Sequence, residues 1–187
     1  MYYHGLERFG SQVSRVAVSK DGLHFTAHEE IIVDRSYLRV FPYRGYYYGM
    51  AMPGVFYRSK CGLTDFEKGP TLFNPHMRHA GLLVMEDRLM VFWTQAGHSP
   101  ERILLSIVDL RGDWSYWKAS AAAEIIRPEY AWEGADLPIE PSVRGAVNSP
   151  VNQLRDPAVF QEDGHTYLLY ATAGESGIAM AEVQFTF

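Results

Sequence analysis

Short apolar runs alternate with turn signals along nearly the whole chain. The clearest example is "LRDPAVFQEDGHTYLLYATAGESGIAMAEV", which reads as strand, turn, strand, turn, strand. Asp163-Gly164 lies between two of these runs, and Asp-Gly is a strong hairpin signal. Helical periodicity is almost absent; the one candidate, residues 119–126, fits a loop or a strand end equally well, and Pro128 follows soon after it. The pattern predicts an all-β fold.

Two internal repeats organise these strands. Residues 77–97 align without a gap with residues 154–174, at a constant offset of 77 positions. Both segments open on an arginine, continue with an apolar pair and a hairpin turn, and end in Ala-Gly. Residues 15–25 resemble residues 55–66 in the same way, because each is a strand followed by Ser-Lys-x-Gly-Leu. The chain is therefore built from similar units.

Combining the repeats divides the chain into four units of up to four antiparallel strands. They span about 1–33, 36–73, 77–128 and 154–187, with a long irregular loop at 127–153. The first unit lacks an opening strand, and the fourth has at most a stub of a last strand in "VQFTF". One such sheet cannot bury both its faces alone, so radial packing predicts a single β-propeller domain over 1–187. A β-sandwich is the alternative, but it does not require a repeated unit.

Composition and charge limit the classes of molecule that we expect this protein to bind. Hydrophobic residues make up 47% of the chain and charged residues 21%, which is typical of a globular protein. The net charge of −5 argues against nucleic acid and anionic membranes, because no basic stripe is available to neutralise phosphates. No run approaches the roughly 20 apolar residues of a membrane helix. Cys61 has no second cysteine to pair with, so the chain forms no internal disulfide. No signal peptide is visible, and we expect a cytoplasmic protein unless a missing N-terminal segment carries a signal peptide.

The "RDPAVF…DG…YLLYA" unit, the "SKDGLHF" turn and the four-stranded repeats together resemble the five-bladed β-propeller glycoside hydrolases, the group of arabinanases, β-xylosidases and invertases. The resemblance implies acidic side chains at the heads of innermost strands, directed at one sugar in a central funnel. The repeat alignment places Tyr37, His79 and Asp156 at those positions, and the first unit's position would precede Met1. The resemblance thus implies an N-terminally shortened relative with about four blades and an incomplete catalytic set.

Glycoside hydrolysis needs one carboxyl that protonates the leaving oxygen and one that attacks or activates water. Asp156 is the first candidate, and Glu140 of the long loop, near Glu133, is the second. The alternative for Asp156 is an ion pair with Arg155 or Arg78 that fixes the strand start. The candidate substrate-binding residues are Arg155, Arg78, His79, Tyr37, Trp132 and Glu175. Because no cofactor motif or metal-ligand spacing is present, we expect no cofactor and no metal.

Three functions remain open at this point. The first is a glycosidase that acts on a carbohydrate in the funnel. The second is a non-catalytic module that binds sugar or another protein, which fits the absence of acids at Tyr37 and His79. The third is a partial propeller that functions only as a homo-oligomer, because open sheet edges favour pairing between chains.

Overall fold

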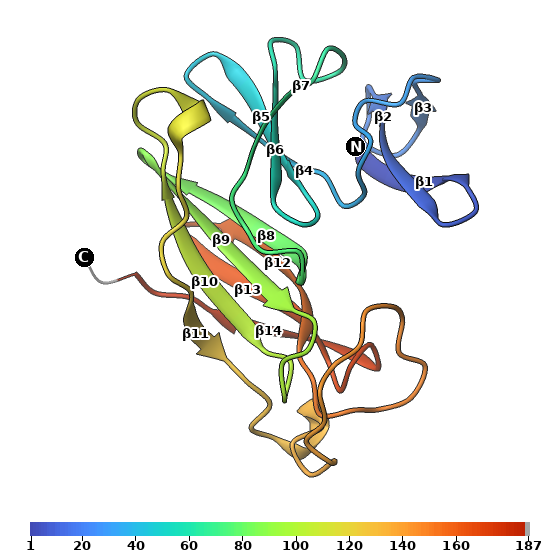
Figure 1. The fold of residues 1–187 in the computed structure, drawn as a ribbon, viewed down its shortest axis with the longest axis vertical. Coiled ribbons are helices and arrows are strands. Elements are labelled where there is room, and N and C mark those ends of the chain that lie inside the picture. Colours follow the sequence, from blue (N-terminus) through green and yellow to red (C-terminus); the bar gives the residue numbers. More distant parts are fainter. Residues whose placement is uncertain (186–187) are drawn as a thin grey trace. The chain divides into compact units, whose positions relative to one another are not determined.

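The computed structural model describes residues 1–185, which form fourteen strands and two short 3-10 helices. The strands make four antiparallel sheets in chain order (Figure 1). The first contains β1 (Tyr2–Arg8), β2 (Ser11–Ser19) and β3 (Phe25–Ala27). The second contains β4 (Arg39–Tyr43), β5 (Tyr46–Ala51), β6 (Val55–Ser59) and β7 (Glu67–Thr71).

The third sheet contains β8 (Met77–Met85), β9 (Arg88–Gln95), β10 (Ile103–Asp109) and β11 (Ala123–Ile126). The fourth contains β12 (Arg155–Glu162), β13 (His165–Thr172) and β14 (Gly177–Glu182). In every sheet, strands that are consecutive in the sequence are neighbours, as the up-and-down repeats predicted. The two 3-10 helices are η1 (Trp114–Tyr116) and η2 (Ala131–Glu133).

The prediction of an all-β fold of repeated antiparallel sheets is confirmed. Of the two alternatives for residues 119–126, the strand end is the one formed, because Ala123 and Glu124 pair with Leu105 and Leu104 of β10. Val183–Phe185 form no strand, and the last two residues of "VQFTF" lie outside the described residues. In residues 1–185, no helix has the length and apolar character needed to cross a membrane.

The chain packs as two compact units. The N-terminal unit comprises residues 1–74 and 111–117, and the C-terminal unit comprises residues 75–110 and 118–187. The core of the N-terminal unit joins β2 to β4–β6 through Val16, Leu38, Ala51, Val55 and Tyr57. The placement of all four sheets in one propeller domain stays a prediction.

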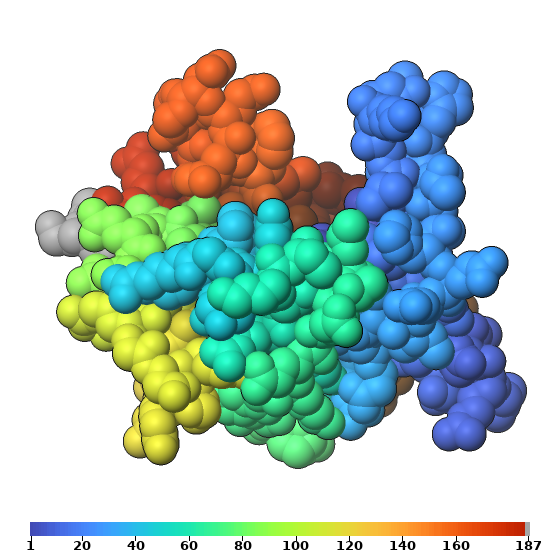
Figure 2. Space-filling view, turned by 90° about the horizontal axis from the view of Figure 1, so that it is seen from above, coloured from blue at the N-terminus to red at the C-terminus, as the bar shows by residue number. Residues whose placement is uncertain are grey.

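In the C-terminal unit, the third and fourth sheets pack face to face (Figure 1). In the space-filling view, the light-green and orange segments of this unit adjoin (Figure 2). Phe92 and Ile103 of the third sheet are fully buried, as are Leu154, just before β12, and Leu168 of β13. The alternation of apolar and polar positions produces this arrangement, because successive side chains of a strand point to opposite faces. One face of each sheet is therefore available for this core.

Side chains within the turn between β2 and β3 accept hydrogen bonds from its backbone amides. The Ser19 hydroxyl accepts a hydrogen bond from the Gly22 amide at 2.9 Å. The Asp21 carboxylate accepts from the Leu23 and His24 amides at 2.9 and 2.8 Å. Hydrogen bonds from His24, with smaller contributions from Leu23 and Ser19, lower the pKa of Asp21. The turn therefore favours a negative charge at this position.

The matching turn after β6 places Cys61 where Asp21 stands in the first sheet. The Cys61 sulfur accepts from the Leu63 and Thr64 amides at 3.5 and 3.4 Å. Hydrogen bonding from Thr64, with smaller contributions from the Leu63 amide and the Ser59 hydroxyl, lowers the pKa of Cys61 to about 6. The turn after β6 thus stabilises a Cys61 thiolate at the position where the first sheet has the Asp21 carboxylate.

We expect alkylation of Cys61 by iodoacetamide to reach half of its plateau rate near pH 6, because the thiolate is the reacting form. The urea-unfolded chain should require a pH of about 8.5, the ordinary thiol value. The Thr64→Val variant should move the folded protein's profile to higher pH, since it removes the largest stabilising contact. Identical profiles for folded and unfolded chains would contradict this account of the turn.

Candidate functional site

The site predicted from the repeat alignment lies in the C-terminal unit, where the edge strands β8 and β12 begin side by side. The pairing register of each strand shifts at the same place, between Met77 and Ala80 in β8 and between Arg155 and Ala158 in β12. Such bulges re-aim the side chains that they contain. The residues between these points, among them His79 and Asp156, are the ones re-aimed.

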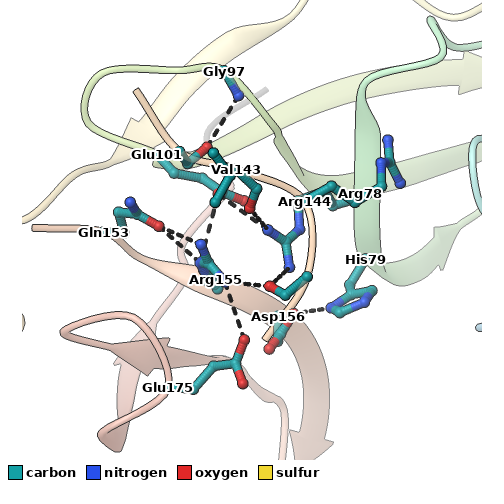
Figure 3. A network of polar contacts seen from close by, with 12 residues as sticks. Arg78, His79, Gly97, Glu101, Val143, Arg144, Gln153, Arg155, Asp156 and Glu175 are labelled. Carbon is teal, nitrogen blue, oxygen red and sulfur yellow. Dashed lines mark hydrogen bonds and ion pairs between the residues drawn. The ribbon is translucent and has the colours of Figure 1, made fainter. Parts of the chain in front are cut away.

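His79 and Asp156, which are matched in the repeat alignment, are in direct contact. Nδ1 of His79 bonds Oδ1 of Asp156 (Figure 3). The two strands approach closely beneath them, because a Cβ on Gly81 would lie 3.1 Å from the Ala158 Cα. Asp156 has a φ of 51°, a left-handed conformation that aspartate tolerates better than most residues. Its side chain is 34% exposed and that of His79 is 14% exposed, so both side chains are partly accessible to solvent.

Next to this pair lies a buried charge cluster, which we call the arginine cluster: Arg78, Arg155, Glu101, Gln153 and Glu175. Arg155 and Glu101 are fully buried and Arg78 is nearly so. Oε2 of Glu101 lies 3.5 Å from Nη1 of Arg78 and 3.6 Å from Nε of Arg155. Neither Glu101 oxygen has a hydrogen-bond partner within residues 1–185, so its charge is balanced by the two guanidinium groups alone.

Arg155 makes further bonds that fix its position (Figure 3). Its Nε and Nη2 donate to Oε1 of Gln153 at 2.9 and 2.5 Å, and its Nη1 donates to Glu175 at 3.1 Å and to the Gly145 carbonyl at 3.0 Å. Burial lowers the pKa of Arg155 and Glu101 opposes this effect, but a guanidinium stays charged in proteins. These bonds thus fix Arg155, which directly precedes Asp156 in the chain.

Five of the eight predicted site residues are therefore gathered in one place: Asp156, His79, Arg155, Arg78 and Glu175. Asp156 pairs with His79, whereas the two arginines pair with Glu101, so the alternative of an Arg–Asp ion pair is not the one formed.

The other three lie elsewhere. Tyr37 belongs to the N-terminal unit, where its ring centroid lies 4.0 Å from that of His4. Trp132 is 55% exposed on the long loop and stacks on Tyr130, with ring centroids 5.5 Å apart. Glu140 is exposed on the same loop, and within residues 1–185 it makes no hydrogen bond or ion pair with Asp156.

Glu133, the other acid of this loop, is buried and has a structural role. Its Oε2 accepts from the Glu129 and Tyr130 amides at 2.8 and 3.2 Å, and its Oε1 accepts from the Tyr170 hydroxyl at 3.0 Å. It caps η2 and ties the loop to β13. This geometry does not leave Glu133 available as a general acid.

Glu101 and Gln153 are members of the site that the sequence pattern does not single out. They form a parallel bridge between the segments that precede β10 and β12. Glu101 lies outside the aligned repeat, Gln153 directly precedes it, and both read as ordinary loop residues. The available signal was the arginine that opens each repeat, since a buried arginine requires a partner of opposite charge.

No family model matches this chain. An uncharacterized protein of Acanthamoeba polyphaga mimivirus is 40% identical over 187 residues, an alignment that covers 91% of this chain and 52% of that protein. The chain therefore spans about half the length of this curated relative.

Several solved structures have a similar fold. A thermostable family-43 glycoside hydrolase matches with a TM-score of 0.59 and 13% identity, over 92% of this chain and 64% of its own. A GH32 β-fructofuranosidase of Bombyx mori matches with a TM-score of 0.66 and 15% identity, over 98% and 45%. A glycosyl hydrolase of Bacteroides ovatus matches with a TM-score of 0.63 and 11% identity, over 97% and 63%. The expected resemblance is thus confirmed: over part of its relatives' length, the chain has the fold of the five-bladed β-propeller glycoside hydrolases.

Proposed function

We propose that this protein binds a carbohydrate at the His79–Asp156 pair. The observation that carries the proposal is the contact between these two partly exposed side chains at the start of β8 and β12. A carboxylate accepts hydrogen bonds from neighbouring sugar hydroxyls, and an imidazole nitrogen can donate or accept one. Arg155 and the bulge in β12 hold Asp156 in place before a ligand arrives, which reduces the entropy lost on binding.

The exposed pair of rings on the long loop supports the same class of ligand. Tyr130 and Trp132 are 58% and 55% exposed, and their planes differ by 6°. Parallel exposed rings offer an apolar surface with polar edges, which suits the faces of sugar rings. Tyr130 and Trp132 therefore offer a second surface on the long loop that suits a sugar ring.

Binding without turnover is the form of this function that the geometry favours. Hydrolysis requires two carboxyl groups on either side of the scissile bond, roughly 5–10 Å apart. Glu101 is fully buried between two arginines, and Glu175 is bonded to Arg155. These contacts leave neither side chain free to approach a scissile bond beside Asp156.

The test is calorimetric titration of the protein with neutral and acidic mono- and oligosaccharides. We expect the Asp156→Asn variant to bind at least about tenfold more weakly, since a hydrogen bond to a charged group contributes roughly 1.5–3 kcal/mol. Asp163→Asn, in the exposed turn at the far end of β12, is the matched control and should bind like wild type. Equal affinity of both variants would overturn the assignment. Product release from a panel of nitrophenyl glycosides, abolished by Asp156→Asn, would replace binding with hydrolysis.

A further inference from the structure

A pocket of about 400 Å³ lies in the C-terminal unit where β8 begins and β9 ends. Its wall is formed by His76, Gln95 and Gly97 on one side and by Ser142, Val143 and Arg144 of the long loop on the other. His76 stands three positions before His79, so the pocket lies at the same end of β8 as the proposed sugar site. Its volume is within the range of small-molecule sites.

The loop side of this pocket is held in place by hydrogen bonds. The Gly97 amide donates to the carbonyl and the hydroxyl of Ser142 at 2.9 and 3.1 Å, and the Ser142 amide donates to the His98 carbonyl at 3.0 Å. Arg78 donates to the Val143 carbonyl at 3.1 Å. Hydrogen bonds at the successive residues Ser142 and Val143 therefore hold this part of the loop in place along the pocket.

Arg144 completes this wall, and the arginine cluster lies close to the loop that carries it (Figure 3). Nη2 of Arg144 donates to the Pro75 and Met77 carbonyls at 2.7 and 3.3 Å, which fixes its guanidinium at the start of β8. The Gly145 carbonyl, next in sequence, accepts from Arg155 at 3.0 Å. The arginine cluster therefore positions this loop as well as Asp156.

The pocket's lining has one fixed positive charge. It is the guanidinium of Arg144, and none of the lining residues is acidic. Glu101, the buried acid of the neighbouring cluster, is matched by two arginines. A cationic concave wall favours an anionic group. Gly97 faces open space, because a Cβ at this position would meet nothing within 4 Å.

We infer that this pocket binds the carboxylate of a sugar acid, so that the carbohydrate of this protein is a uronic acid or an oligosaccharide that contains one. A planar guanidinium suits a carboxylate, and the Gln95 amide and Ser142 hydroxyl suit the hydroxyls of the same ring. The inference rests on the proposed function, since it names the class of sugar that the His79–Asp156 pair would hold.

The experiment compares glucuronate and galacturonate with glucose and galactose, which have the same ring hydroxyls without the carboxylate. In calorimetric titrations of wild type, we expect the uronates to bind at least about tenfold more tightly than the neutral sugars, and increasing salt to weaken only the uronates. Arg144→Gln should reduce uronate affinity to that of the neutral sugars. Arg127→Gln removes an equal charge from an exposed pair with Glu124 and should leave uronate affinity unchanged.

The outcomes separate this inference from the proposed function. Equal wild-type affinity for glucose and glucuronate would overturn the inference and leave the proposed function standing. Displacement of glucuronate by an equal concentration of inorganic phosphate would also overturn it, because charge alone would then be recognised. If no sugar of either kind bound, both would fail. The wild-type comparison and its salt dependence decide the question even where Arg144→Gln unfolds the loop.

Discussion

Replacing Arg155 with alanine is expected to lower the free energy of unfolding by about 3–5 kcal/mol, because removing one partner of a buried charge cluster weakens the compensation of the charge that remains. Glu101 would keep only Arg78, at 3.5 Å, in a site from which water is excluded. Gln153 and Glu175 would lose their bonds to the guanidinium as well. Urea unfolding followed by tryptophan fluorescence measures the change.

Two companion variants identify the cause of this loss. Arg127→Ala removes an arginine whose side chain is half exposed, and we expect it to cost less than about 1 kcal/mol. Adding Glu101→Gln to Arg155→Ala should lower the stability further, because it leaves the buried Arg78 guanidinium without its acidic partner. A double variant as stable as Arg155→Ala would show that the loss comes from packing and not from the charge.

Replacing Glu133 with alanine is expected to cost about 3 kcal/mol, since three bonds to a buried carboxylate are lost together. The Tyr170 hydroxyl would remain buried without its acceptor. Burial, followed by the bond to Glu133, raises the pKa of Tyr170, so this hydroxyl is a proton donor throughout the neutral range. The same urea titration measures the change.

Tyr170→Phe is the matched control for this variant. It removes only the bond between the two side chains and leaves the cap of η2 intact, so we expect a loss of about 1–1.5 kcal/mol. If Glu133→Ala and Tyr170→Phe were equally destabilised, the bonds to the Glu129 and Tyr130 amides would contribute nothing. The loop would then be held by other contacts.

The fold class was predictable because its signals are local. Alternating apolar residues and the Asp163-Gly164 turn act over a few neighbouring positions, and each hairpin forms where they indicate. The offset of 77 positions is visible in the sequence alone, and it matches β8 with β12 and His79 with Asp156. Residues 119–126 were ambiguous, because their strand forms only by pairing with β10, from which the segment that carries η1 separates them.

The candidate site depended on tertiary packing. Glu133 and Glu140 are equivalent loop acids in the sequence, but burial makes Glu133 a helix cap and leaves Glu140 exposed. The sequence also offers Arg155 as the partner of Asp156, whereas the folded chain pairs Arg155 with Glu101. Desolvation decides which charges must be matched, and the sequence does not state which side chains are desolvated.

Spacing along the chain is enough to establish the strands, their repeat and the equivalence of His79 and Asp156. It does not establish that these two side chains touch, that Glu101 balances Arg78 and Arg155, or that residues 142–145 contribute to the wall of a pocket. Those features come from the folded chain, because most of these contacts join segments tens of residues apart. Their energies depend on burial and on local shifts in strand register, which arise only once the sheets have packed.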